Sequence, residues 1–161
     1  RKLAITIPAG IEEDTQVRLT GEGEHGINGG PPGDLYVAFK IKEHDYFVRD
    51  GINIKYRLPI NVAQASLGAK LKVPTLDGDH EIEIPPGTQT GRIFRVRGRG
   101  VAQLRGDRRG DLLVFIDVRI PKTLDSQQQK LMNELGESLP DTYEDDEDKG
   151  IFDKFRSAFT N

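Results

Sequence analysis

The chain has 161 residues, of which 35% are hydrophobic and 30% charged, with a formal net charge of −3 and no cysteine. This length allows one domain or two small ones, and the lean hydrophobic content predicts thin cores. The composition excludes disulfides and thiolate metal sites, and the charge favours no polyanionic partner. No apolar run approaches the roughly 20 residues of a membrane span. We expect a reducing, cytoplasmic environment.

The first part of the chain carries short segments with strand-like alternation. Residues 3–7 alternate apolar with polar or small side chains, which predicts a half-buried strand. Residues 17–19 alternate again before a long glycine loop, and residues 35–41 form the longest clean alternation in this part. Short segments bounded by turns predict an all-β module.

The middle of the chain continues this pattern after a predicted hinge at residues 47–51, where Asp50-Gly51 is a strong turn pair. Residues 52–58 alternate as a strand that Pro59 is expected to close. A short helix is predicted at residues 61–67, capped by Asn61 and stopped by Gly68. Further strands are predicted at residues 71–73, 80–84, 94–96 and 112–118, with a hairpin turn at Asp77-Gly78.

An internal repeat relates these two parts. Residues 7–37 superpose without a gap on residues 84–114 at an offset of 77 positions, which aligns glycines, a proline and aliphatic residues. Such a repeat predicts two copies of one module. The second copy has residues 52–77 ahead of its repeated core, whereas the first has only Arg1 and Lys2 there. We therefore expect the first module to lack its opening strands and the chain to be a fragment of something longer.

The pattern changes after Pro121. Asp125 is predicted to cap a helix, with Gln128 at the reciprocal position of a capping box. An apolar stripe follows at helical spacing, formed by Leu131, Met132, Leu135 and Leu139. Two partners are possible for this stripe, the chain's own sandwich or a second chain, and we favour the second chain. Residues 141–148 predict a solvated acidic linker, and four apolar residues at helical spacing then predict an amphipathic tail.

No enzyme chemistry is predicted. The three histidines, His25, His44 and His80, are widely spaced and lack thiolates, so no metal site is expected. No catalytic serine or cysteine pattern occurs. Arginines alternate with glycines between Arg92 and Arg109, which leaves an alternative function as an adaptor for nucleic acid or another polyanion. The same glycines recur in the acidic first copy, so they serve the turn, and nucleic acid is not favoured as a partner.

An exposed sheet edge can bind an extended peptide as an added strand, which suits a protein with many unfolded partners. The segments that carry the clearest resemblance are HDYFVRDGINIKYRLPINVAQASLG, KVPTLDG, IPPGTQTG, FRVRGRG and RGDLLVFIDV. Together with IPAG, GEG and PPGDLYV, they resemble the C-terminal substrate-binding region of bacterial DnaJ co-chaperones, from Arg1 to about Leu139. The family's J domain and cysteine-rich zinc repeats have no match here. A zinc module in a full-length protein stays possible, and no cofactor is expected in this chain.

The resemblance implies an all-β fold of two tandem β-sandwiches, the first incomplete, followed by a short dimerisation helix. We expect the rest of the first sandwich at residues 1–47, the second at 48–122, the dimerisation helix at 123–140, and the acidic linker and amphipathic tail at 141–161. The implied function is to bind unfolded clients and, in a homodimer, to deliver them to a DnaK-type chaperone in the stress response. Carried onto matching strands, the client-binding residues are Val37 first, then Leu3, Ile5 and Phe39. The alternative for all four is ordinary core, which we favour for Phe39.

Overall fold

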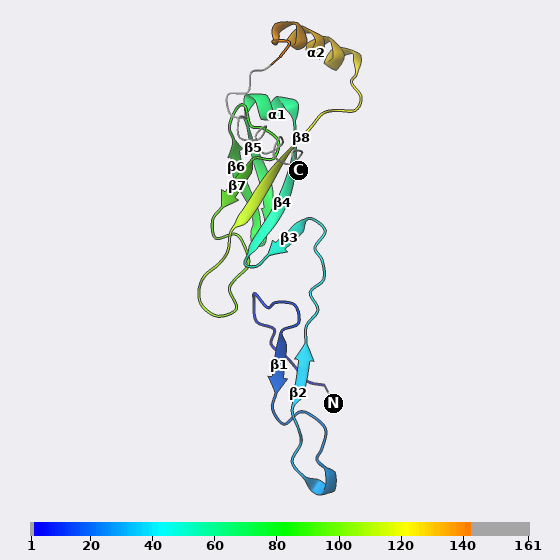
Figure 1. The fold of residues 1–161 in the computed structure, drawn as a ribbon, viewed down its shortest axis with the longest axis vertical. Helices are drawn as coiled ribbons and strands as arrows, with labels where there is room; N and C mark the ends of the chain where they lie inside the picture. The colour runs from blue at the N-terminus through cyan, green and yellow to red at the C-terminus, as the bar shows by residue number, and fades with distance from the viewer. Residues whose placement is uncertain (1, 143–161) are drawn as a thin grey trace, which may run out of the picture. The chain divides into compact units, whose positions relative to one another are not determined.

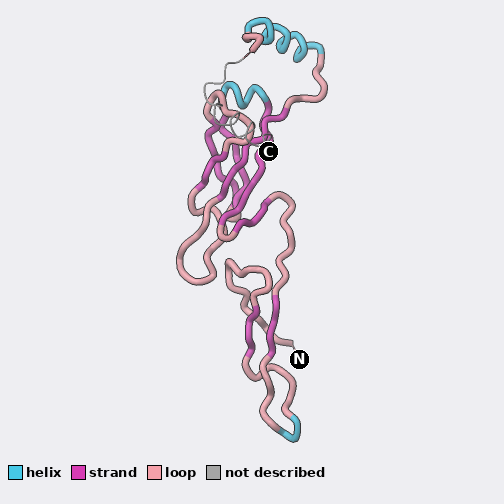
Figure 2. The backbone as a smooth tube through the Cα atoms, viewed as in Figure 1, coloured by secondary structure: helices cyan, strands magenta, loops and turns pink. Residues whose placement is uncertain are grey.

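The computed structural model describes residues 2–142. The chain divides into two compact units, Arg1–Ile120 and Pro121–Asn161, and each is described by itself. In the described residues all the strands lie in the first unit, whereas the second contains a helix and no strand (Figure 2). The fold is therefore all-β with a short C-terminal helix, as predicted. The predicted acidic run and amphipathic tail extend into residues 143–161, which lie outside the described residues.

A β-sandwich forms from Phe47 onward (Figure 1). One layer is a four-stranded sheet in the order β3-β4-β8-β7, in which β4 and β8 run parallel. Its strands are β3 (Phe47–Asp50), β4 (Asn53–Asn61), β7 (Ile93–Val96) and β8 (Leu112–Arg119). The other layer is a hairpin of β5 (Ala69–Thr75) and β6 (Gly78–Ile84). Both layers contribute to a single core, which includes Ile54, Leu58, Ile60, Val73, Ile82, Ile84, Leu112, Val114 and Ile116.

The predicted short helix is α1 (Val62–Leu67), which connects β4 to β5. Asn61 Oδ1 accepts a hydrogen bond from the Gln64 N–H at 2.8 Å, and Gln64 Oε1 accepts one from the Asn61 N–H at 3.0 Å. This capping box satisfies two of the N–H groups that a helix start leaves unpaired. Gly68 follows with a φ of 80°, a left-handed conformation that glycine adopts without a steric penalty, and the helix ends there.

Two predictions about the second module are wrong. Pro59 does not close a strand, because β4 continues to Asn61 and Pro59 pairs with Asp117 of β8. The ladder with β3 ends at Tyr56, so on that side of β4 no described strand needs the N–H that proline lacks. Residues 47–51 are not a hinge either. Phe47–Asp50 forms β3, and the Phe47 side chain is buried in the core.

The first copy forms a two-stranded ladder of β1 (Gln16–Leu19) and β2 (Leu35–Ala38), with a 3-10 turn at Ile27–Gly29 in the loop between them. No hydrophobic residue before Phe47 is buried among those that the structure describes. The strand predicted at residues 3–7 is absent, since no described strand forms a ladder with it. Alternation of apolar and polar residues predicts which side chains would share one face of a strand, but it does not show that a neighbouring strand is present to pair with it.

The repeat is reproduced in the register of the strands. Val17 faces Val37 in the first copy, and Phe94 faces Val114 at the matching positions of the second copy. The loop is repeated as well, because Asp34 Oδ1 accepts from the Gly21 N–H at 3.0 Å and Asp111 Oδ1 accepts from the Gly98 N–H at 2.9 Å. These matched contacts show that the two copies share one local structure.

The second unit contains α2 (Ser126–Ser138), which begins with the predicted capping box. Asp125 Oδ1 accepts from the Gln128 N–H at 2.8 Å, and Gln128 Oε1 accepts from the Asp125 N–H at 3.0 Å. Leu139 is the residue that ends the helix. No helix in residues 2–142 is long and apolar enough to cross a membrane.

Candidate functional site

The apolar face of the β1–β2 ladder is only partly covered. Val37 lies opposite Val17, and Leu35 lies opposite Leu19, so their side chains project to the same face. All four are half-buried, as is Phe39, which follows on the same side of the chain. The Phe39 N–H donates to the Thr15 carbonyl at 3.3 Å and extends this contact beyond the end of β2.

The second copy shows how the same face looks when it is covered. Val114 and Leu112, the counterparts of Val37 and Leu35, are 0% exposed, and Ile116, the counterpart of Phe39, is 2% exposed. Their cover comes from the core formed with β4, β5 and β6. Within residues 2–142, the first copy has no strands at the corresponding places. Its apolar face is therefore less covered than the matching face of the second copy.

One edge of β2 also differs from its counterpart. In the second copy, β8 pairs with β7 along one edge and with β4, in parallel, along the other. In the first copy, β2 pairs with β1, and no strand of the described residues pairs along the other edge. Unpaired backbone groups along a strand edge can accept an added strand. Val37 lies on this strand, and its side chain projects to the partly covered apolar face.

The remaining predicted client-binding residues lie less favourably. Leu3 is exposed and Ile5 is half-buried, and no backbone ladder within residues 2–142 joins either of them to β1 or β2. Phe39 lies two residues beyond Val37 and is hydrogen-bonded through its backbone at the end of the hairpin. The structure thus brings Val37 and Phe39 to one face, and it gives no ladder that holds Leu3 and Ile5 there.

Leu131, Met132 and Leu135 of the predicted dimerisation stripe lie on α2, and Leu139 follows as its C-terminal cap. Leu131 is 57% exposed, Met132 38%, Leu135 49% and Leu139 45%. Large side chains at helical spacing with this exposure form an apolar strip on one side of the helix. No described residue of this unit is buried against it.

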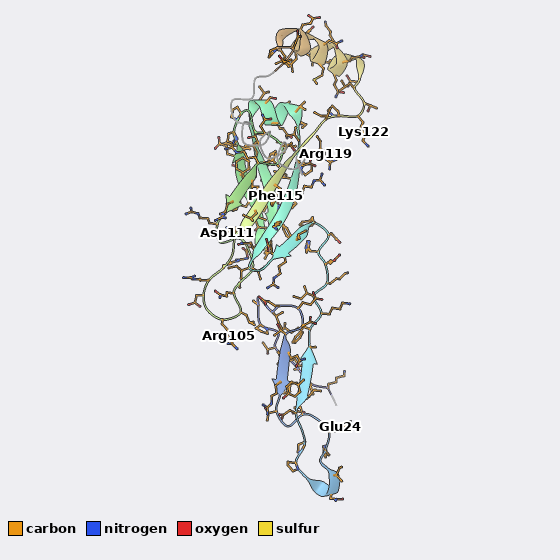
Figure 3. All side chains as sticks on the ribbon, in the orientation of Figure 1. Glu24, Arg105, Asp111, Phe115, Arg119 and Lys122 are labelled. Carbon is orange, nitrogen blue, oxygen red and sulfur yellow. The ribbon has the colours of Figure 1, made fainter. Side chains whose placement is uncertain are left out.

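The arginine-rich segment is largely paired with its own module. Asp77 binds Arg109 at 2.8 Å and Arg99 at 3.2 Å. The hydrogen bond from Arg109 is the largest cause that lowers the pKa of Asp77, with a further contribution from Arg99, although partial desolvation opposes both. The Arg92 guanidinium stacks 5.1 Å from the centre of the Phe94 ring. Arg105 lies on the loop between β7 and β8, away from Asp111 at the start of β8 (Figure 3). Arg99 and Arg109 are therefore engaged within the module, whereas Arg97, Arg105 and Arg108 are exposed.

The described residues contain no candidate metal centre. No group of three or more histidine or acidic side chains there could hold a metal ion. His44 Nδ1 accepts from the N–H groups of Tyr46 and Phe47, both at 3.4 Å, so this histidine has a structural role at the start of β3. The chain has no cysteine, so it offers no thiolate ligand for a zinc ion.

One arrangement was missed by the sequence reasoning. Arg49 of β3 donates to the Ile11 carbonyl at 2.6 Å, to the Gly10 carbonyl at 3.0 Å and to the Gly51 carbonyl at 2.9 Å. A charged hydrogen bond to each carbonyl ties residues 10–11 of the first copy to the β3–β4 turn. The only sequence signal was an arginine in the segment interpreted as a hinge.

The described residues thus contain a tandem repeat of one β module, with a closed second copy and a first copy whose strand β2 has one unpaired edge. Comparison with known proteins identifies the family. The family model described as "DnaJ C terminal domain" matches residues 1–121. The chain belongs to the DnaJ family through this C-terminal domain.

The chain is similar to bacterial proteins named "Chaperone protein DnaJ". The chain is 47% identical over 161 residues to the one from Brevibacillus choshinensis, covering 99% of this chain and 43% of the relative. It is 45% identical over 159 residues to the one from Oceanobacillus iheyensis, covering 99% and 42%. It is 50% identical over 136 residues to the one from Rhodopirellula baltica, covering 84% and 35%. The chain therefore spans less than half the length of these relatives.

Proposed function

We propose that this chain is the client-binding and dimerisation region of a DnaJ-type co-chaperone, which holds unfolded polypeptides for a DnaK-type chaperone in the cytoplasm. It performs no enzymatic step, and it uses no cofactor. The observation that carries the proposal is the contrast between Val37, half-buried on an open strand, and Val114, 0% exposed in the closed copy. Main-chain hydrogen bonds to β2 would give affinity with little sequence preference, and the apolar face would favour apolar residues.

The client site can be tested with a fluorescein-labelled peptide of alternating leucine and threonine, followed by fluorescence anisotropy. Val37→Lys places a charge on the apolar face, and we expect the affinity to fall more than about tenfold, or ~1.4 kcal/mol. Tyr36→Lys is the matched control, because Tyr36 is 57% exposed on the opposite face of the same strand. Equal losses in both variants would refute a site on the Val37 face. Phe39→Ser, Leu3→Ser and Ile5→Ser then establish how far that site extends.

Dimerisation is proposed to occur through the apolar strip of α2, because side chains with this exposure gain free energy when a second copy covers them. Light scattering on the intact chain and on one ending at Lys122 measures the molar mass of each. We expect a dimer and a monomer respectively. In the full chain, Leu135→Lys should dissociate the dimer, whereas Asn133→Lys, a residue outside the strip, should not. A monomeric intact chain would remove the dimerisation role.

The polyanion-binding alternative has weaker support. Arg92, Arg99 and Arg109 have partners within the module, and Arg95 lies 3.7 Å from Asp111. An oligonucleotide that bound with a steep dependence on salt would favour this alternative, since released counterions dominate such binding. Salt-tolerant binding of an apolar extended peptide would favour the client-binding function.

A further inference from the structure

An open groove of about 820 Å³ lies along β3 in the first unit. Residues of the first copy line it together with residues of the second sandwich. Its apolar lining consists of Ile41, Phe47, Val48, Ile54, Leu76 and Val101. Val48 is 63% exposed and Leu76 is 47% exposed, so the groove presents apolar surface to solvent. This surface is separate from the Val37 face.

The wall formed by β3 is a free strand edge. β3 is the outer strand of its sheet, and no described strand pairs with its other side. Asp50 pairs with Asn53 across a two-residue turn in which Gly51 has a φ of 60°. Because hydrogen-bonded pairs alternate along an antiparallel ladder, Arg49 and Ile54 form a pair whose backbone groups point away from each other. The Ile54 N–H indeed donates to the carbonyl of Asp111, the residue before β8, at 3.0 Å.

It follows that the backbone N–H and C=O of Arg49 point to the open edge of β3, as does the C=O of Phe47. The Phe47 N–H on the same edge donates to His44 Nδ1 at 3.4 Å, a long hydrogen bond. An extended peptide laid along this edge can pair with these groups. Its alternate side chains would then enter the apolar groove.

The charges that line the groove favour a basic partner. Glu12, Glu13 and Glu43 line it, and none has an ion pair within residues 2–142. Two basic side chains, Lys42 and Arg49, also line the groove. Arg49 donates hydrogen bonds to three backbone carbonyls, so Lys42 is the basic side chain that remains to balance the three carboxylates. Opposite charges around an apolar site increase both the association rate and the selectivity for a partner.

We propose that this groove is a second peptide-binding site, which takes extended polypeptide in which apolar residues lie beside lysine or arginine. The inference rests on the proposed client-binding function and extends it from one site to two. One client segment can occupy the Val37 face while another segment of the same polypeptide binds along β3. Linking two weak sites raises the overall affinity, because the second binding event becomes intramolecular.

Two peptides with the same leucine–threonine centre test the proposal, one flanked by lysines and the other by glutamates. Fluorescence anisotropy with the full chain measures the affinity for each. We expect the lysine-flanked peptide to bind more tightly, and Glu12→Gln with Glu13→Gln to remove most of that preference. The matched control is Glu81→Gln with Glu83→Gln, since both residues are exposed on β6 outside the groove. High salt should weaken the preference in the same way.

Apolar variants test the groove itself. Leu76→Ser should weaken binding of the lysine-flanked peptide about fivefold, and Ile93→Ser should leave it unchanged, because Ile93 is 50% exposed and lies outside the groove. Weakening by Val37→Lys alone would overturn the second site and leave the proposed function intact. No binding of either peptide by the unmodified chain would overturn both. Weakening by Leu76→Ser together with loss of the lysine preference in the Glu12 and Glu13 variant would support the second site.

Discussion

Val37 and Val114 occupy the same position in the two copies, and truncation of each to alanine separates core from site. Val114 is 0% exposed, so the change removes the equivalent of two buried methylenes and leaves a cavity. At ~0.8 kcal/mol for each methylene, with a further cost for the cavity, we expect a loss of about 2–3 kcal/mol in the free energy of unfolding. Val37 is only half-buried, and its truncation should cost less than about 1 kcal/mol.

Urea unfolding followed by far-ultraviolet circular dichroism measures both variants. With a slope of about 1–3 kcal/mol per molar urea, the Val114→Ala midpoint should fall by roughly 1 M or more, whereas the Val37→Ala midpoint should change little. Peptide affinity should show the reverse order: Val37→Ala should bind the peptide more weakly, whereas folded Val114→Ala molecules should bind it as the unmodified chain does. If Val37→Ala lowered the midpoint as far as Val114→Ala does, Val37 would be core, and the argument for a binding face would fail.

Three further predictions concern stability. Gly110→Ala should destabilise by at least ~1–3 kcal/mol in the same unfolding assay, because its Cβ would lie 1.9 Å from the Ile52 carbonyl oxygen; Gly33→Ala is the control, since the nearest atom there is 3.8 Å away. Asn61→Ala removes the cap of α1 and should cost about 1 kcal/mol, seen as faster amide exchange at Gln64. Arg109, and then Arg99, lowers the pKa of Asp77 below its usual 3.8, so Asp77 contributes stability above that pH, which is lost as the pH falls through its lower folded value. Asp77→Asn should reduce this acid dependence relative to Asp79→Asn, and an equal effect of both variants would contradict the assignment.

The repeat made most of the second module's strands and the β1–β2 ladder predictable, because matched glycines and aliphatic residues imply matched turns and faces. Both capping boxes were also predictable, since a capping residue and its reciprocal partner lie three residues apart in the chain. These features depend on local spacing, which the sequence records directly.

The features that were missed depend on neighbours distant in the chain. Pro59 predicts the end of a strand from the sequence, yet it lies within β4. The strand tolerates it because β3 stops pairing with β4 at Tyr56. The groove along β3 is lined by residues from both copies, and no sequence motif predicts that these residues lie together. Residues 3–7 have the alternation of a strand, but no strand pairs with them within residues 2–142. Periodicity thus predicts faces, and it does not predict which strands meet.

The unpaired edge of β2 has a consequence for the protein in concentrated solution. An unpaired strand edge that can pair with a foreign strand can also pair with the same strand of another copy of this chain. When copies pair head to tail, the contact does not close into a ring, so further copies can add to it. If clients bind this edge as proposed, they compete with other copies of the chain for one row of backbone groups, and the relative concentrations of the two decide the outcome. A bound client would act as a solubiliser of its own chaperone, because each occupied edge is one that cannot nucleate a growing sheet.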